Sequence, residues 1–435
     1  MHAGKNLKPD AAENPRPLSH AERFARLDAH LAAYESLWRS SPHAWLSKGK
    51  PLPWEAGFAP LAEALRALPA ARVQALHEDA QACRIFLRRH LPVLDELAAL
   101  VALPDTDSAL LPRQAHAAAH VGGRKLEQIR HFESALPTGF AHHAAPEKTA
   151  IIDWCAGKGH LARWLSARDG RAHLCLERDE ALCTEGQRLA GALPLRFQAL
   201  NVMDEAVRAP LRGSAAVLAL HACGDLHTRL LRLAVEEGVT ELALAPCCYN
   251  RTQERHYRPL SALAREHARL ELDRDALRLP LLETVTATGY ERRETQRRAV
   301  WRLAAQQWCQ EVGIALPVES PHAARATDFP AYLRSVAPAV LARWAGQGKT
   351  REGERECERR ERQGARRLST LRALELPRAA FRRAIEVWLV LDMAVFLEEA
   401  GYDVQLMAFC PRTLTPRNIL LHARRPACGA QASGR

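Results

Sequence analysis

The sequence predicts an α/β fold in which a mostly parallel sheet is covered by helices on both faces. Between residues 149 and 250, short apolar runs alternate with helical segments, which is the pattern of strands joined by crossover helices. These runs are apolar throughout rather than at alternate positions, as is typical of parallel strands buried on both faces. The chain before residue 149 shows only helical periodicity, so an all-α region is expected to precede the sheet.

The N-terminal region is predicted to be helical behind a short tail. Residues 1–20 are polar and contain prolines, so we expect a disordered tail there. Over residues 21–148, apolar side chains recur at helical spacing in segments such as RFARLDAHLAAYESLW and CRIFLRRHLPVLDELAALV. Loops such as SKGKPLPWEAG separate these segments. The last helix of the region, GGRKLEQIRHFESAL, leads into the sheet.

The strands of the sheet are predicted from apolar runs on both sides of an insertion. The runs before residue 250 are TAIIDWC, AHLCLERD, LRFQALNVMD, AAVLALHACGD and TELALAPCCYN. The pattern is then lost, so residues 251–376 are predicted to be an insertion. The buried helix AAFRRAIEVWLVLDMAVFLEEAG and the runs YDVQLMAF and NILLHARR close the same sheet. The sheet domain would therefore comprise residues 149–250 and 377–425, with a disordered tail at 426–435.

The charge balance favours a phosphate-rich partner. The chain carries 61 Lys and Arg against 50 Asp and Glu, a formal net charge of +11. Arginine predominates and binds phosphate bidentately, which favours RNA or DNA; an arginine bias of genome composition is the alternative. The run GKTREGERECERRERQGARR within the insertion is predicted to be a solvated helix or flexible loop, with RNA contact as the alternative.

The location expected for the protein is the cytoplasm. No run of about 18 apolar residues is present, which argues against a membrane span. The N-terminus is polar and has no apolar signal core, which argues against export. The 11 cysteines are spread over a long chain and several fall within predicted core strands, as expected for reduced thiols.

The turn after the first strand predicts a cofactor that lies against the backbone. Its sequence is Asp153-x-Cys155-Ala156-Gly157-Lys158-Gly159. A dinucleotide fingerprint would place a third glycine near Leu161 and Ala162, and a phosphate-binding P-loop would continue with Ser or Thr after Lys158. An acid followed by small residues instead suits S-adenosylmethionine, which has no phosphate. Gly157 and Gly159 would admit its amino-acid moiety, and Asp153 would meet its ammonium group directly or through water.

The next two strand ends supply groups for an adenosine. Glu177 ends the second strand, where an acid can accept hydrogen bonds from both ribose hydroxyls, although a lone glutamate is more often a surface charge. Asn201 or Asp204 follows the third strand and would bond the adenine amino group, with Val202 in the same pocket. Because the carboxyl ends of parallel strands meet at one edge of the sheet, these groups are expected to lie together.

Chemically distinctive residues follow the fourth and fifth strands. They are His221, Cys223, Gly224, Asp225 and His227, then Pro246, Cys247, Cys248, Tyr249 and Asn250. Residues 246–250 would form a rigid substrate floor, or either cysteine of that segment would be a nucleophile for a pyrimidine ring. A third interpretation is zinc or an iron–sulfur cluster, with Cys155 and His221 as further ligands. No C-x-x-C pair is present and Cys155 belongs to the cofactor turn, so no metal is assigned; inert buried thiols are the simplest alternative.

Two flanking segments are expected to complete the site. Arg124, Lys125 and Gln128 belong to the helix before the first strand and would fold over the pocket; otherwise this helix is a solvated linker. Arg417 and Asn418 lie between the last two strands and would reach the same edge, unless they form a simple polar turn. These residues are the predicted substrate contacts.

The segments DWCAGKGHLA, LHACGDLHT, APCCYN, RKLEQI and TPRNILL together resemble a family of class I S-adenosylmethionine-dependent methyltransferases. The family includes eukaryotic methyltransferase-like proteins regarded as possible rRNA methylases, and a related branch holds a tRNA ribose 2′-O-methyltransferase. The resemblance covers roughly residues 122–250 and 381–425. It implies a Rossmann-like methyltransferase sheet with seven strands, an antiparallel last strand and, by analogy, an RNA substrate.

The chain departs from the tRNA branch in one informative place. That branch carries histidines after its paired cysteines, whereas this chain has Tyr249 and Asn250, which argues against ribose methylation. We expect an S-adenosylmethionine-dependent methyltransferase that methylates structured RNA, tRNA or rRNA, by direct methyl transfer. His221 or Asp225 would act as the base or orienting group, and His221 would also border the cofactor. The alternatives are methylation of a protein or small molecule, a non-catalytic RNA-binding protein with this fold, and a metal or redox protein.

Overall fold

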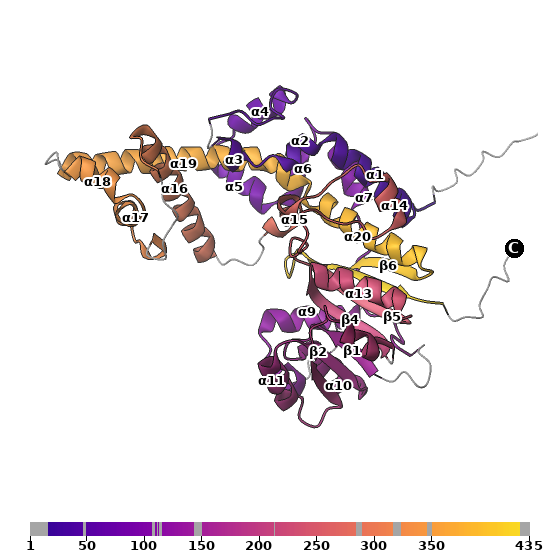
Figure 1. The fold of residues 1–435 in the computed structure, drawn as a ribbon. Coiled ribbons are helices and arrows are strands. Elements are labelled where there is room, and N and C mark those ends of the chain that lie inside the picture. The colour runs from indigo at the N-terminus through magenta and orange to yellow at the C-terminus, as the bar shows by residue number, and fades with distance from the viewer. Residues whose placement is uncertain are drawn as a thin grey trace, which may run out of the picture.

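The computed structural model describes residues 16–46, 49–106, 109–110, 112, 115–142, 150–212, 214–283, 289–315, 323–345 and 350–426. The predicted tails fall almost entirely outside these ranges. A mixed sheet with helices on both faces forms one part of the molecule, a group of helices lies beside it, and a helical arm projects from that group (Figure 1).

The sheet has seven strands in the order β3-β2-β1-β4-β5-β7-β6. The strands are β1 (Ala150–Trp154), β2 (His173–Glu177), β3 (Leu195–Ala199), β4 (Ser214–Cys223), β5 (Glu241–Cys247), β6 (Asp403–Ala408) and β7 (Ile419–Arg424). Strands β1 to β5 pair in parallel, and β7 pairs antiparallel with both β5 and β6. The predicted α/β class, with a mostly parallel sheet and an antiparallel last strand, is confirmed.

Helices cover both faces of the sheet because successive residues of its strands point to opposite sides. Ile151 packs in a cluster with α9 (Gly123–Ser134) and α10 (His160–Asp169), whereas Ile152 packs in the cluster that contains α13 (Asp225–Glu236). The other helical elements between residues 115 and 212 are α8 (Ala115–Ala118), α11 (Glu180–Ala190), η1 (Glu205–Val207) and α12 (Arg208–Arg212). The continuous apolar character of the strands follows from this double cover.

The N-terminal helices begin at a capping box. The hydroxyl of Ser19 accepts a hydrogen bond from the backbone N–H of Glu22 (3.2 Å), and the Glu22 carboxylate accepts one from the backbone N–H of Ser19 (2.8 Å). The helices are α1 (His20–Ala33), α2 (Glu35–Arg39), α3 (Pro42–Leu46), α4 (Ala59–Arg66), α5 (Ala70–Glu78), α6 (Ala80–Leu87) and α7 (Val93–Leu100). Their apolar residues belong to the same core cluster as Ile152 of the sheet.

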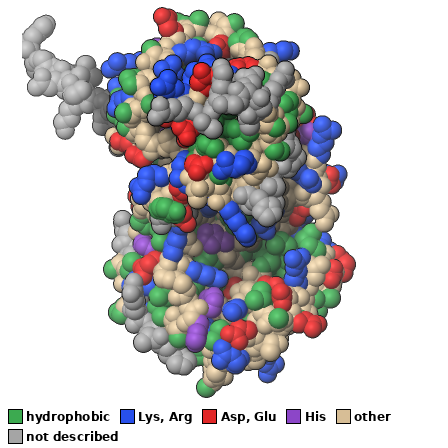
Figure 2. Space-filling model, turned by 90° about the vertical axis from the view of Figure 1, so that its left-hand side faces the viewer, with side chains coloured by type: hydrophobic (Ala, Val, Ile, Leu, Met, Phe, Trp, Pro, Cys, Tyr) green, Lys and Arg blue, Asp and Glu red, His purple; other side chains and the backbone are tan. Residues whose placement is uncertain are grey.

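The segment after β5 contains a helical arm with its own core. The elements of the segment are α14 (Ala262–His267), α15 (Arg274–Arg278), η2 (Leu279–Leu282), α16 (Gly289–Glu311), η3 (Ala323–Arg325), α17 (Phe329–Val336), α18 (Pro338–Ala345) and α19 (Thr350–Ala380). The arm begins at α16. Trp301, Trp308, Phe329 and Tyr332 are buried together between α16, α17 and α19. Viewed from the side of the arm, the surface is hollowed between the arm and the sheet (Figure 2).

From residue 350 onward the charge run is helical and forms the start of α19, as one of the two predicted forms, but one of its faces is buried rather than solvated. Arg360 is 8% exposed, bonds Glu356 through Nε at 2.6 Å, and lies 5.1 Å from the ring centroid of Trp308. An arginine can cover an aromatic face with its guanidinium while remaining paired to a carboxylate. The run is thus helical, with one face that stabilises the arm.

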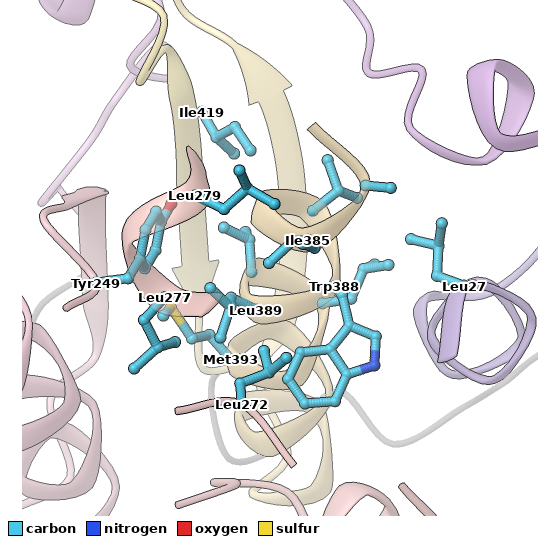
Figure 3. Close-up of a cluster of buried hydrophobic side chains, with 14 of the residues drawn as sticks. Leu27, Tyr249, Leu272, Leu277, Leu279, Ile385, Trp388, Leu389, Met393 and Ile419 are labelled. Carbon is cyan, nitrogen blue, oxygen red and sulfur yellow. The ribbon is translucent and has the colours of Figure 1, made fainter. Parts of the chain in front are cut away.

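Helix α20 (Arg382–Glu399) is buried on nearly all sides and joins the N-terminal helices to the sheet. Figure 3 shows Leu27 of α1 on one side of α20, and Leu279 of η2 with Ile419 of β7 on another. The rings of Phe24 and Trp388 lie 5.0 Å apart between α1 and α20. Although α20 is largely apolar, neither it nor any other described helix is long and apolar enough to cross a membrane.

A buried carboxylate fixes α20 to the segment after β5. Asp392 has no exposed surface and accepts hydrogen bonds from the Tyr257 hydroxyl (2.7 Å), the Leu260 N–H (2.8 Å) and the Ser261 N–H (2.9 Å) and hydroxyl (2.6 Å). A buried carboxylate is stable when its lone pairs are satisfied in this way. Asp392 therefore determines how residues 257–261 cross the helix.

Replacing Asp392 by Ala should lower the free energy of unfolding by about 3 kcal/mol or more, because several buried donors lose their acceptor. The matched control is Glu399→Ala on the exposed end of the same helix. Its carboxylate accepts from the backbone N–H groups of Ala262 (2.7 Å) and Leu263 (3.0 Å), and its loss should cost about 1 kcal/mol, as loss of a helix cap does. Equal urea-unfolding midpoints for the two variants would contradict this assignment.

Candidate active site

The turn that follows β1 depends on left-handed backbone. Cys155, Gly157 and Gly159 have φ angles of 57°, 59° and 63°. A Cβ on Gly159 would lie 2.5 Å from the Phe197 ring and 3.2 Å from the sulfur of Cys175, so this position admits no side chain. A Cβ on Gly157 would meet no atom within 4 Å. Gly159 packs the turn onto the sheet, and Gly157 borders open space.

Asp153 and Glu177 meet at this turn. They lie at or next to the ends of the adjacent parallel strands β1 and β2. The backbone N–H of Gly157 donates to Oε2 of Glu177 at 3.0 Å, and Oδ2 of Asp153 accepts from the N–H of Ala162 at 3.3 Å. The two acids predicted to hold the cofactor are therefore brought to one edge of the sheet. Ala156 is buried beneath the turn in a small apolar cluster.

The Asp153 carboxyl is poised to change charge near neutrality. Burial is the main cause that raises its pKa to about 7; the nearby Glu177 carboxylate acts in the same direction, while the Ala162 N–H and Lys125 act in the opposite direction. A buried carboxyl with this pKa is stabilised as a carboxylate when a cation binds beside it. The ammonium group of an amino acid is such a cation.

The third strand ends at a small hydrogen-bonded turn. The side chain of Asn201 donates to Asp204 at 3.2 Å and accepts from the N–H of Met203 at 3.2 Å. The backbone of Leu200 donates to the carbonyl of Glu177 at 2.8 Å, which holds this turn beside the end of β2. Asn201 is exposed, whereas the side chain of Val202 is buried in the main core.

A bulge in β4 directs His221 to the same edge. The β4–β5 register shifts between Leu220 and Ala222, and His221 has a φ of 66°. Its Nε2 lies 3.1 Å from Oε1 of Gln128 on α9. Burial, together with nearby cations of which Arg417 is the foremost, lowers the pKa of His221 to about 4. The imidazole is therefore neutral at physiological pH.

The side chain of Asp225 holds the loop after β5. Its Oδ2 accepts from the N–H of Gln253 at 2.8 Å, and its own N–H donates to the carbonyl of Arg251 at 3.0 Å. Gly224 permits this approach, since a Cβ there would lie 1.9 Å from the Arg251 oxygen. Asp225 is thus engaged in positioning the loop that carries residues 248–250.

Residues 246–250, predicted to form the substrate floor, lie partly in the core and partly at the edge of the site. Tyr249 is 4% exposed, and its ring lies edge-on to His227 with centroids 5.8 Å apart. Figure 3 places Tyr249 beside the buried side chains of η2 and α20. Cys248 and Asn250, on either side, are only half-buried. The backbone of this segment borders the site while the tyrosine ring anchors it.

The cysteines at the strand ends fall into two groups. The sulfurs of Cys223 and Cys247 lie 3.3 Å apart on paired positions of β4 and β5, and that of Cys248 joins them within 4.8 Å. Hydrogen bonding among these thiols raises the pKa of Cys247 and lowers that of Cys248. Cys155 lies in the cofactor turn, where burial and neighbouring carboxylates raise its pKa to about 12.

The flanking residues link α9 and the β6–β7 loop to the site. Arg124 donates through Nε to the carbonyl of Leu414 at 2.8 Å, so α9 is attached to that loop. Arg417 donates to the carbonyl of Glu283 at 3.2 Å, while the buried Asn418 donates to the carbonyl of Cys410 at 2.6 Å and holds the loop closed. Lys125 is exposed beside them.

The contacts of His221, Asp225 and Lys125 were not foreseen. The His221–Gln128 contact, the Asp225 tether and the action of Lys125 on Asp153 all join segments far apart in the sequence. The glycine immediately after the fourth apolar run was the one local sign that the chain approaches its own backbone there.

This combination of sheet, glycine turn and paired acids is that of a nucleoside-binding α/β domain. Residues 124–255 match a family model described as a methyltransferase domain, and this range contains β1 to β5 with the strand ends described above. The resemblance inferred from the sequence is confirmed to this extent: this segment of the chain is similar to a methyltransferase domain.

The chain is also similar to a solved geranyl diphosphate methyltransferase in complex with GPP and sinefungin. The identity is 18% and the TM-score is 0.22; the match covers 38% of this chain and 64% of that one.

The residues of the turn fit S-adenosylmethionine. Asp153 is a buried carboxyl in need of a cation, Gly157 leaves open space beside the backbone, and Glu177 lies at the neighbouring strand end. Asp153 would hold the ammonium group and Glu177 the ribose hydroxyls, while the turn itself would lie along the amino-acid moiety.

The two glycines of the turn should respond differently to a methyl group. Gly157→Ala and Gly159→Ala both place a side chain at positive φ, which costs about 1–2 kcal/mol. Gly159→Ala should be less stable by a further ~1–3 kcal/mol, because its methyl collides with Phe197. Urea unfolding measures this difference, and a Gly157→Ala protein that is equally or more destabilised would contradict it.

Binding of S-adenosylmethionine should weaken as the pH falls below 7. The raised pKa of Asp153 means that the free protein must lose a proton to pair with the ammonium group, so affinity should fall about tenfold per pH unit well below the pKa. Asp153→Asn should bind more weakly at about pH 7.5 and show no such slope. Calorimetric titrations compare the two proteins, and an unchanged slope in Asp153→Asn would assign the proton to another group.

Proposed function

We propose that the chain is an S-adenosylmethionine-dependent methyltransferase that acts on structured RNA, either tRNA or rRNA. The observation that carries the proposal is a group of cations near the ends of β4 and β5. Its members are Arg124, Lys125, Arg251 and Arg417, each close enough to His221 or Cys248 to interact with it electrostatically. A substrate rich in phosphate matches this rim, since Arg and Lys bind phosphate without regard to nucleotide sequence.

The wider surface supports the same substrate class. On the face shown in Figure 2, Lys and Arg side chains border the hollow, and a histidine lies at its floor. The net charge of +11 adds a long-range attraction for nucleic acid. A large folded RNA would contact both the sheet part and the arm, whereas a small molecule has no use for that span.

In this function, S-adenosylmethionine supplies an electrophilic methyl group that carries its own leaving group. The chain orients the acceptor and takes its proton. His221 is neutral at physiological pH, and its contact with Gln128 fixes the ring. Asp225 positions the loop beside it rather than receiving the proton, because its carboxylate is bonded to Gln253.

We favour an atom of a nucleotide base, rather than the ribose hydroxyl, as the methyl acceptor. By this criterion we expect the chain to be related to the eukaryotic methyltransferase-like proteins. Tyr249 and Asn250 stand where the ribose-methylating branch carries histidines. Tyr249 lies in the core, so this segment offers backbone and the Asn250 side chain to a flat ligand.

Mass spectrometry of nucleosides from cells with and without the gene tests the substrate class. Loss of one methylated nucleoside from tRNA or rRNA is expected, and it should return with the wild-type gene but not with Asp153→Asn. An unchanged profile in both RNA pools would contradict the RNA proposal and favour a protein or small-molecule acceptor.

The cationic rim has its own test in RNA binding. Arg251→Ala should weaken binding and reduce the slope of log K against log salt by about 1, as expected for the loss of one phosphate contact. Arg212→Ala is the control, since that arginine pairs with Glu237 at the end of α12, away from the strand ends. Equal effects of the two substitutions would show that the rim makes no specific contact.

A further inference from the structure

We propose that Cys223, Cys247 and Cys248 bind one zinc ion at the ends of β4 and β5. Their three sulfurs all lie within 4.8 Å of one another, and the closest pair is 3.3 Å apart. A tetrahedral ion with Zn–S bonds of about 2.3 Å separates its sulfur ligands by about 3.8 Å. The thiols are therefore already near the positions that such an ion requires.

The fold, rather than a local motif, brings these sulfurs together. Cys223 and Cys247 are register partners on adjacent parallel strands, so they lie side by side although no C-x-x-C spacing is present. Cys248 follows directly with a φ of 47°, a left-handed conformation that non-glycine residues seldom adopt. This turn places the third sulfur beside the first two.

Hydrogen bonds hold the backbone of the three cysteines in place. The N–H of Gly224 donates to the carbonyl of Cys247 at 3.2 Å, and the N–H of Arg251 donates to the carbonyl of Cys248 at 2.9 Å. Asp225 anchors the following loop at Gln253. An unusual backbone conformation that its surroundings enforce in this way is a feature of binding and catalytic sites.

The donor set selects the ion. Three thiolates suit zinc, which is bound in tetrahedral geometry by Cys ligands, better than they suit magnesium or calcium, which take oxygen. Within the described residues, this group of mutually close ligand atoms contains only the three sulfurs. The fourth position would therefore be filled by water or by an atom of a bound molecule, as in zinc sites that act on substrates.

The surroundings suit the charge of such a site. Three thiolates and Zn²⁺ carry a net charge of −1, and the guanidinium groups of Arg251 and Arg417 lie close enough to Cys248 to interact with it. The sulfur of Cys223 also lies 3.5 Å from the carbonyl oxygen of His221, which places the ion beside the candidate active site. The zinc site is independent of the identity of the methyl acceptor.

Metal analysis of the full-length protein tests the proposal. The chain is purified under reducing conditions without chelator or polyhistidine tag, and zinc is measured by inductively coupled plasma mass spectrometry. About one zinc per chain is expected, bound tightly enough to survive dialysis. Cobalt substitution should give the intense visible bands of a tetrahedral ion and a sulfur-to-cobalt charge-transfer band.

Variants assign the ion to these sulfurs. Cys248→Ser and Cys223→Ser should each lose zinc and the charge-transfer intensity, while the control Cys357→Ser, in the separate core of the arm, should keep both. Circular dichroism identifies any variant that fails to fold, and both substitutions are at half-buried cysteines, so folded proteins are expected. A metal-free wild type with reactive thiols, a Cys223–Cys247 disulfide, or zinc retained by the Cys248→Ser protein would each overturn the proposal.

Discussion

The structure depends on the burial of α20. A helix that is apolar around most of its circumference must be enclosed, and here the enclosure is shared by the sheet, the N-terminal helices and the segment after β5. Asp28 of α1 accepts hydrogen bonds from both the Trp388 indole (3.1 Å) and the Arg269 N–H (2.8 Å), so all three meet at one point. The N-terminal helices are consequently a covering layer of the sheet domain rather than a separate appendage.

The same enclosure sets the rigidity of the candidate site. Tyr249 packs under η2 and α20 while its neighbours reach the rim, so the loop after β5 is anchored from below. Asp225 secures the loop from the adjacent strand end. A site built on strand ends and fixed loops holds its groups in place before any ligand arrives, which is how catalytic geometry lowers the entropic part of a barrier.

The sheet and the cofactor turn could be predicted from the sequence because each depends on the residues of one short segment. A buried parallel strand must be apolar throughout, and a backbone that turns with positive φ requires small residues, as at Gly157 and Gly159. The tertiary contacts of these segments could not be predicted, because periodicity indicates which side of a helix is buried but not which segment packs on it. The pairing of His221 with Gln128, the burial of Arg360 in a charge-rich helix and the inward ring of Tyr249 all arise from contacts between distant segments. The register of β4 and β5, which aligns Cys223 with Cys247, likewise has no signature in either run alone.

The long helix α19 has a mechanical consequence. Its 31 residues at a rise of about 1.5 Å each make a rod of about 46 Å, continuous from the tip of the arm to the junction with α20. Pro377 lies in its last turn, where the missing N–H weakens the ladder close to the fixed end. Arg372 bonds the side chain of Gln74, and Arg378 bonds the carbonyl of Trp38, so the N-terminal helices hold this end of α19 on both sides of Pro377. The helix therefore acts as a strut that supports the separate core of the arm at its other end.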